Sequence, residues 1–548
     1  MTGIRRWAWT ILLFAVGCAS TAPPAPVTGG TPQLVVVFVV DGLPERQVVD
    51  YRDQFSPDGF ERFFTRGAWF TNANYGYAYT VTSPGHSTIV TGAYPHRSGI
   101  VGNEWIDPAS GASETSVSDA SAPFLGEEGA GAETGSPAKL RVESLGDVLR
   151  RQDERSKVIS ISNKGYSAIL TAGRRGTAYA LRPRTGEYSS TAYYMKALPP
   201  WVAEFNASKP ADKYFGLEWR PVLDDAAYSR SLPDERKWYA KGGKLPRKVG
   251  EGREKPDAAY YTELLGTPFA DDLELQFARA AIAGERLGRR GSPDLLVICL
   301  SAHDHVNHAY GAESRLSHDH VLQLDRMLAE FFGDLDTTVG RENYLAVLTA
   351  DHGFMPAPEH SQSLGRDAGR VSAARLSAKV NAGLAPRFGA GTWLGPWSAH
   401  GVILNHALIK ARGVDAGALA EEARKLLAAE PGVAVAYTRE ELESGSAKGA
   451  PLFEAMANSF DRERSPDIAV ALKPYWMFGT GRGTTHGSPY EYDTNVPLLF
   501  YGPPWILPGR IDRRVEMSGV APTLARLLHV PAPAASEGQV LPLDFIHR

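Results

Sequence analysis

The stretch Leu34-Val-Val-Val-Phe-Val-Val40 is a continuous apolar run, and it ends on Asp41-Gly42. Such a run is typical of a strand buried on both faces, as in a parallel sheet that helices cover on both sides. Similar runs occur at Val158–Ile161, Leu295–Leu300, Tyr344–Leu348, Ile468–Leu472 and Pro497–Tyr501. Helical patterns lie between them at Asp271–Leu287, Ser317–Leu335 and Ala418–Ala429. The alternation predicts a doubly wound α/β core.

The composition excludes several classes of protein. The chain has 548 residues, of which 43% are hydrophobic and 22% charged, which excludes a disordered, collagen-like or coiled-coil protein. The formal net charge of −4 shows no basic excess, so we expect no nucleic-acid partner. The two cysteines, Cys18 and Cys299, exclude a disulfide-dense scaffold.

The N-terminus predicts export. Residues 1–17 combine a short basic stretch with an apolar run that is shorter than the ~20 residues needed to span a bilayer. The run ends in Ala15-Val16-Gly17-Cys18, which resembles a bacterial lipoprotein cleavage box. Residues 18–32 are a Pro/Gly/Ser/Thr-rich flexible tether. We therefore expect a periplasmic protein anchored to the membrane through lipid on Cys18, or else a secreted protein with an ordinary signal peptide.

We expect residues 33–548 to form one domain with three insertions. Residues 108–138 are rich in Gly, Ala, Ser and Glu and predict a surface loop or flap. Residues 183–262 carry many Tyr, Trp, Lys and Pro without clear strands and predict an accessory cap. Residues 366–460 alternate helix and strand patterns, as a small inserted α+β unit would.

Carboxylates and imidazoles follow three of the apolar runs directly. They are Asp41, the Asp304 and His308 pair, and Asp351-His352, and His486 lies in a later loop. Asp304 and His308 are four residues apart, so they share one face if the segment is helical. Ligands of open parallel sheets bind at the carboxyl ends of strands. Each aspartate alone fits a helix cap, but Asp and His together suit a divalent ion such as Zn²⁺.

A second informative stretch is Thr80-Val81-Thr82-Ser83-Pro84-Gly85-His86. We expect Pro84 to be the first residue of a helix, with Thr82 or Ser83 near its cap. A hydroxyl there faces free amide N–H groups and the positive end of the helix, which favours a bound anion. The stretch by itself fits a plain N-cap threonine equally well.

Six motifs together carry a resemblance to a known family. They are Asp41-Gly42, Thr82-Ser-Pro-Gly-His86, Gly99-Ile-Val-Gly-Asn103, Asp304-x-x-x-His308, Asp351-His352-Gly353 and His486-Gly487-Ser488. In order and spacing the chain resembles the alkaline phosphatase superfamily. It is most similar to the secreted bacterial zinc phosphatases with a threonine nucleophile, and near the nucleotide pyrophosphatase/phosphodiesterase branch. The resemblance implies an alkaline-phosphatase-like three-layer sandwich with a mostly parallel central sheet and inserted cap regions.

The resemblance also implies a site with two zinc ions and Thr82 as nucleophile. The family's pattern gives the first zinc the ligands Asp304, His308 and His486. It gives the second zinc Asp41, Asp351 and His352, with the Thr82 oxygen beside it. Two cations about 4 Å apart clamp the entering and leaving oxygens of an in-line displacement.

Two further positions match groups that bind the phosphate in the family, and a third departs from the family's pattern. Asn103 matches an amide that hydrogen-bonds a phosphate oxygen, and Lys164 matches a lysine of the monoester-preferring members. Those members carry an arginine where this chain has Tyr166. Losing a bidentate cation weakens the preference for a monoester dianion, although Tyr166 still offers one hydrogen bond.

Three functions stay open at this point. The resemblance favours hydrolysis of phosphate monoesters through a phosphothreonine at Thr82, and Tyr166 favours a phosphodiesterase or nucleotide pyrophosphatase on the same site. The third function is a lipoprotein that binds zinc or phosphate without turnover. We expect small-molecule phosphate esters as partners, no membrane contact besides the Cys18 anchor, and a monomer. Other histidines that compete as ligands, or that fit packing roles, are His86, His303, His305, His318 and His320.

Overall fold

The structure is a computed structural model that describes residues 30–107, 110–127, 129, 132–239 and 243–545. The predicted signal peptide, the cleavage box with Cys18 and most of the tether lie outside the described residues. Among the helices that the structure describes, none is both long enough and apolar enough to cross a membrane.

The first apolar run of the sequence lies at the centre of a ten-stranded sheet. Strand β1 (Leu34–Val40) pairs in parallel with β10 (Asp294–Leu300) on one side and β11 (Tyr344–Thr349) on the other. Strands β5 (Val158–Ser162) and β6 (Thr177–Arg182) continue the parallel part beyond β10. Every residue of β1, β10 and β11 is buried, as the continuous apolar runs predicted.

Antiparallel strands complete both sides of the sheet. Strand β18 (Asn495–Tyr501) runs antiparallel between β11 and β2 (Ala68–Asn74), and β7 (Glu187–Ser189) pairs antiparallel with β6. The register of β18 with β2 shifts between Val496 and Leu498, because Pro497 has no N–H to donate to the ladder. Two short strands, β19 (Gly509–Ile511) and β20 (Val515–Glu516), pair in parallel with β2.

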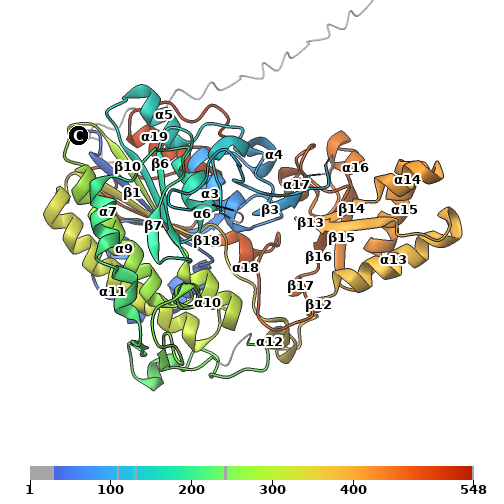
Figure 1. Ribbon diagram of the computed structural model, residues 1–548, viewed down its shortest axis with the longest axis horizontal. Helices are drawn as coiled ribbons and strands as arrows, with labels where there is room; N and C mark the ends of the chain where they lie inside the picture. Colours follow the sequence, from blue (N-terminus) through green and yellow to red (C-terminus); the bar gives the residue numbers. More distant parts are fainter. Residues whose placement is uncertain (1–29, 108–109, 128, 130–131, 240–242, 546–548) are drawn as a thin grey trace, which may run out of the picture.

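Helices cover both faces of this sheet and make the three-layer sandwich of Figure 1. One layer contains α7 (Pro200–Ala207), α9 (Pro268–Glu285) and α11 (Arg315–Leu335). The opposite layer contains α3 (Thr82–Thr91), α5 (Leu145–Gln152), α6 (Gly165–Ala172) and α19 (Val520–Leu527). The predicted α/β class, with a mostly parallel central sheet, is confirmed.

A second, smaller sheet lies in residues 369–478, which we call the inserted unit. It contains four antiparallel strands in the order β13 (Leu394–Ser398), β14 (Gly401–Leu404), β16 (Ile468–Leu472) and β15 (Val433–Thr438). Helices α13 (Ala373–Phe388) and α15 (Ala416–Ala428) pack on it around a core of its own that includes Leu384, Trp393 and Leu427. Figure 1 shows this unit projecting from the larger body, which we call the main unit.

One predicted strand belongs to a different sheet from the one we expected. Ile468–Leu472 is a strand, but it pairs antiparallel with β14 and β15 instead of joining the parallel sheet. Its five residues are all buried, so the apolar run looks the same as one from the main sheet. Only the partners that the tertiary structure brings to it separate the two cases.

The remaining elements are short and mostly join the larger ones. In the main unit they are α1 (Glu45–Asp50), α2 (Glu61–Arg66), α4 (Pro95–Ser98), β3 (Glu104–Ile106), β4 (Ser113–Thr115), β8 (Glu218–Trp219), β9 (Arg247–Lys248), α8 (Ala258–Leu264), α10 (Ala302–Tyr310), α12 (Pro358–Ser363) and α18 (Glu491–Thr494). In the inserted unit they are β12 (Gly369–Val371), α14 (His406–Arg412), α16 (Arg439–Ser444), α17 (Phe453–Asn458) and β17 (Trp476–Phe478). Strand β12 pairs in parallel with β17, so the two ends of the inserted unit lie side by side.

Candidate active site

Three strand ends meet at one edge of the main sheet. Val40 lies opposite Leu300 in the register of β1 and β10, so the residues that follow these strands start out as neighbours. The Asp41 backbone N–H donates to the Leu300 carbonyl over 2.9 Å. Gly42 has a φ of +71°, and a Cβ there would lie 3.2 Å from Asp304 Oδ1. A glycine is therefore needed where the chain turns away from Asp41 and passes Asp304.

Asp304 and His308 are brought together by helix α10, as their spacing predicted. The helix begins at Ala302, directly after β10, and His308 Nε2 lies 3.3 Å from Asp304 Oδ1 one turn along. The loop after the inserted unit brings in His486, whose Nε2 lies 3.6 Å from the same oxygen. The His308 and His486 rings are 5.1 Å apart.

Two groups of three side chains could each hold a metal ion. Within each group, the potential ligand atoms lie within 4.8 Å of one another. One group is Asp304, His352 and His486, and the other is Asp41, Asp351 and His352. His352 belongs to both, and its ring stacks on His486 at 3.5 Å. The side chain of His308 is 40% exposed and lies beside Asp304 without joining either group.

His308, His352 and His486 each present Nε2 to this edge of the sheet. Nδ1 lies 2.9 Å from a backbone carbonyl in each: Thr484 O for His308, Gly353 O for His352 and Thr80 O for His486. A carbonyl oxygen only accepts, so Nδ1 carries a proton, and in the neutral ring Nε2 is the nitrogen that has the lone pair. Metal-binding histidines are held in this way by a partner on the other ring nitrogen.

Individual carboxylate oxygens of the site are buried without a hydrogen-bond partner. Asp41, Asp304 and Asp351 are at most 2% exposed. Asp41 Oδ1 and Asp304 Oδ1 are buried and accept no hydrogen bond from any residue that the structure describes. Buried carboxylates need cations nearby. The donor set of carboxylate oxygens and imidazole nitrogens therefore fits divalent metal ions.

Lys164 supplies a positive charge between the two groups. Its Nζ lies 2.6 Å from Asp304 Oδ2 and 2.7 Å from Asp41 Oδ2. Burial favours the neutral amine, but Asp304 and Asp41 outweigh it and raise the pKa of Lys164 well above its usual value. The side chain thus stays protonated beside one carboxylate of each group.

Thr82 is the hydroxyl that lies against this edge. It is 1% exposed, and its Oγ1 lies 3.4 Å from His352 Nε2. Helix α3 begins at Thr82, two residues before the expected Pro84, with Val81 as a cap that makes no side-chain hydrogen bond. Neither Thr82 nor Ser83 acts as the predicted helix cap. The Ser83 N–H, a first-turn donor that a cap side chain could bind, donates instead to Asn103 Oδ1 over 2.7 Å.

Close packing holds helix α3 in place. A Cβ on Gly85 would lie only 2.1 Å from the Asp351 carbonyl oxygen, so the helix touches the backbone of Asp351 directly. His86, a fully buried residue one turn after Thr82, has its Nδ1 2.9 Å from Thr82 O and 3.2 Å from Asp351 Oδ2. In the sequence, only the Thr-x-x-x-His spacing on a helix indicated this contact. The same spacing fits a histidine that only packs against its neighbours.

Asn103 and Tyr166 lie with His486 along one cavity. The cavity has a volume of about 660 Å³ and continues toward the inserted unit. Because Asn103 Oδ1 accepts from Ser83, the amide NH₂ group of Asn103 stays available as a donor. Burial raises the pKa of Tyr166 to about 12, so its phenol stays protonated and can donate at neutral pH.

Three of the competing histidines have other partners, and the fourth, His305, is buried with no hydrogen-bond partner for its Nε2 among the described residues. His303 lies 3.1 Å from His320 and 2.8 Å from Gln47, and His320 lies 3.3 Å from Asp271. His318 contacts Ser231 and Gln54. His305 follows Asp304 in α10, and burial lowers its pKa to about 4. None of these four joins the two ligand groups found among the described residues.

The comparisons with known proteins agree on one family. Residues 35–495 match the family described as type I phosphodiesterase / nucleotide pyrophosphatase. A protein of Myroides odoratus named calcium-transporting ATPase is 33% identical, over 92% of this chain and 93% of its own. Alkaline phosphatase PhoV of Synechococcus elongatus is 32% identical, over 94% of this chain and 93% of its own.

Alkaline phosphatase PafA of Elizabethkingia meningoseptica is 30% identical, over 93% of both chains. A crystal structure of wild-type PafA matches this fold with a TM-score of 0.85, at 29% identity, over 93% of this chain and 98% of its own.

Proposed function

The chain belongs to the type I phosphodiesterase / nucleotide pyrophosphatase family, and on that basis we propose that it is a two-zinc phosphatase that hydrolyses phosphate monoesters through a phosphothreonine at Thr82. The names of PhoV and PafA support a phosphatase. One observation carries the choice of site. The Thr82 hydroxyl lies 3.4 Å from Nε2 of His352, the residue shared by both groups of potential metal ligands.

The ligand set follows the resemblance and the donor atoms at the sheet edge. Asp304, His308 and His486 would hold one zinc, and Asp41, Asp351 and His352 the other. Bound zinc supplies positive charge that lowers the pKa of a nearby hydroxyl and stabilises a leaving oxygen. The Nε2 lone pairs of the three histidines and the partnerless oxygens Asp41 Oδ1 and Asp304 Oδ1 support this assignment.

The reaction has two displacements at phosphorus. In the first, Thr82 Oγ1 attacks, the P–O bond to the alcohol breaks, and the alcohol leaves as phosphothreonine forms. In the second, water attacks the same phosphorus, the bond to Oγ1 breaks, and inorganic phosphate leaves with Thr82 restored. Thr82 is the first residue of a ten-residue helix, so the phosphoryl group lies near the positive end of α3.

Two side chains hold the phosphoryl oxygens. The NH₂ group of Asn103 donates to one oxygen, since its carbonyl oxygen is already used by Ser83. Lys164 pairs with Asp41 and Asp304 in this structure, and its ammonium group would hold a phosphoryl oxygen where bound metal ions compensate those carboxylates. Both groups stabilise the negative charge of the phosphoryl oxygens, which is present throughout the reaction.

Tyr166 favours a second candidate, a phosphodiesterase on the same site. Its neutral phenol offers one hydrogen bond but no charge, and a diester carries one negative charge less than a monoester dianion. Hydrolysis of nitrophenyl phosphate and of methyl nitrophenyl phosphate by the same preparation separates the two. A higher kcat/KM for the monoester supports the phosphatase, and a higher kcat/KM for the diester replaces it with the phosphodiesterase.

The location of the protein stays a proposal from the sequence. We propose export with removal of residues 1–17 and lipid attachment at Cys18, which the basic stretch, the apolar run and the cleavage box support. The partners are then small phosphate esters outside the cytoplasm, acted on by a monomer. Substitution C18S should move the protein from the membrane fraction to the soluble fraction, and unchanged fractionation would refute the anchor.

A further inference from the structure

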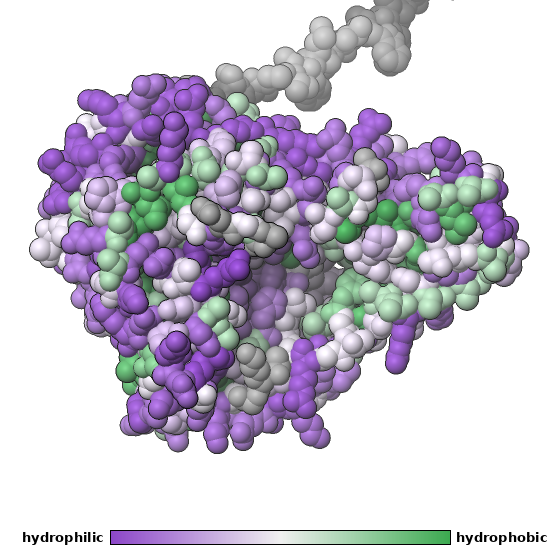
Figure 2. Space-filling view, in the orientation of Figure 1, coloured by the Kyte–Doolittle hydropathy of each residue, from purple (hydrophilic) through white to green (hydrophobic). Residues whose placement is uncertain are grey.

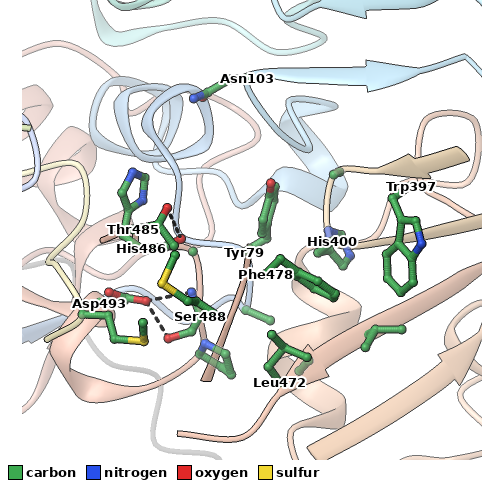
Figure 3. Close-up of a pocket in the computed structure, with 18 of the residues that line it drawn as sticks. Tyr79, Asn103, Trp397, His400, Leu472, Phe478, Thr485, His486, Ser488 and Asp493 are labelled. Atoms are coloured by element: carbon green, nitrogen blue, oxygen red, sulfur yellow. Dashed lines mark hydrogen bonds between the residues drawn. The ribbon is translucent and has the colours of Figure 1, made fainter. Parts of the chain in front are cut away.

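The cavity beside the site extends well beyond the phosphate-binding groups. Its volume is about 660 Å³. One end is formed by His486, Asn103 and Tyr166, and the other by the inserted unit, with Trp397, His400 and Phe478. Figure 3 shows Tyr79 between His486 on one side and His400 and Trp397 on the other, and Figure 2 shows the hollow between the main and inserted units. The far end therefore lies where the organic part of a bound ester would extend.

His400 is a buried polar side chain without a partner. It is 6% exposed, and neither ring nitrogen has a hydrogen-bond partner among the residues that the structure describes. Its backbone is fixed, because His400 O accepts from Val470 N over 2.8 Å and the preceding Ala399 has a φ of +47°. A buried polar group left unpaired destabilises the fold, so such a group calls for an explanation such as a ligand.

The surroundings of His400 keep it neutral. Burial lowers its pKa to about 4, so at neutral pH the ring has one N–H donor and one acceptor nitrogen. None of the described residues that line the cavity is a lysine or an arginine. The acids Glu104 and Asp493 do line it, and Asp493 accepts from the backbone N–H and the hydroxyl of Ser488. With no lysine or arginine among the described lining residues, the cavity offers no cationic partner for a second phosphate or another anion.

Aromatic rings form the walls around His400. The Tyr79 ring centroid lies 5.1 Å from that of His400, and the Trp397 and Phe478 centroids lie 5.0 Å apart. The indole N–H of Trp397 already donates to Ser377 Oγ over 2.9 Å. The rings therefore offer faces and edges for apolar contact. The ring nitrogens of His400 are covered from solvent in this structure, so they reach a ligand when the His400 side chain turns toward the cavity.

We propose that this far end is a leaving-group subsite, in which His400 selects phosphate monoesters of uncharged aromatic alcohols that carry a hydrogen-bonding edge. The inference rests on the proposed phosphatase function and names its substrate class. The phosphoryl group lies at Thr82, the ring lies among Tyr79, Trp397 and Phe478, and the polar edge of the ring bonds His400. Selectivity thus comes from the inserted unit together with Tyr79, and chemistry comes from the main unit.

The test compares three monoesters on wild-type protein and on two variants, H400A and H400F. Methylumbelliferyl phosphate has a ring with a carbonyl edge, naphthyl phosphate has a ring without one, and methyl phosphate has no ring. For both variants we expect kcat/KM to fall about tenfold with methylumbelliferyl phosphate, because each variant loses roughly one hydrogen bond to this substrate. Methyl phosphate should be unaffected, and H400F should keep naphthyl phosphate hydrolysis because it keeps the ring.

The matched control is H406A, which removes an exposed histidine of the same unit that does not line the cavity. It should leave all three kcat/KM values unchanged. Equal effects of H400F on the three substrates, or none on methylumbelliferyl phosphate, would overturn the subsite while leaving the phosphatase intact. No hydrolysis of any monoester by wild-type protein would instead overturn the proposed function and the subsite with it.

A measurement on wild-type protein covers the case in which the variants do not fold. Free methylumbelliferone should inhibit methyl phosphate hydrolysis competitively, with a lower inhibition constant than naphthol. An inhibition constant equal to or higher than that of naphthol would contradict the role of His400.

Discussion

The main unit and the inserted unit meet at the same cavity but contribute opposite kinds of surface. The main unit brings buried carboxylates, imidazoles and Lys164 from strand ends and loops that are far apart in the sequence. The inserted unit is one continuous segment with its own core, and it brings aromatic walls and an uncharged histidine. The difference indicates that bond-breaking groups and selecting groups can change separately, because they belong to separately packed cores.

The largest expected effect comes from removing the proposed nucleophile. Substitution T82A should lower kcat by about 10⁴-fold or more, the scale seen when an enzyme loses its nucleophile. Phosphate release and covalent labelling of the protein by phosphate-labelled substrate are the measurements. The control is S83A, which removes the neighbouring hydroxyl that bonds Ser116 Oγ over 2.8 Å. If S83A loses the label and T82A keeps it, the nucleophile has been assigned to the wrong residue.

Metal removal should act on the main unit alone. A chelator should stop turnover and lower the Tm, because it leaves Asp41, Asp304 and Asp351 buried with less positive charge nearby. Adding Zn²⁺ should restore both, and chelator already saturated with zinc serves as the control. Phosphate release that continues at the wild-type rate would contradict a metal-dependent site. Metal binding without any phosphate release in the untreated protein would favour a binding lipoprotein.

A smaller effect is expected at Tyr166, at the end of the cavity that His486 and Asn103 also line. Substitution Y166R adds a bidentate cation near the phosphate, and we expect the ratio of monoester to diester kcat/KM to rise about tenfold. Y166F, which removes only the hydroxyl, is the matched control and should not raise the ratio. The same ratio in Y166R and wild type would mean that position 166 does not touch the phosphate.

The smallest effect on turnover is expected in the core of the inserted unit. Leu384 is fully buried there, so L384A should lower the stability of this unit by about 2–5 kcal/mol. Hydrolysis of methyl phosphate, which does not reach the aromatic walls, should stay at the wild-type rate below the transition temperature. Denaturation followed by fluorescence measures the stability, and the rate of methyl phosphate hydrolysis shows whether the main unit is affected. A parallel loss of methyl phosphate turnover would show that the two cores are coupled.

The sequence by itself predicted the main sheet and the kind of residues at its edge. Continuous apolar runs identify strands buried on both faces, and parallel strands place the residues after Val40, Leu300 and Thr349 at one edge. The spacing of Asp304 and His308 likewise predicted a shared helix face. These features are local, or follow from how parallel strands must align.

The tertiary structure alone decided the rest. Ile468–Leu472 has the same pattern as a main-sheet strand, and only its partners β14 and β15 place it in the inserted unit. The position of His352 between the two ligand groups depends on how three loops pack, and no spacing encodes it. His400 had no signal at all, because its role depends on a cavity between two units, and a lone histidine in a turn has no periodicity that reveals which surface it will face.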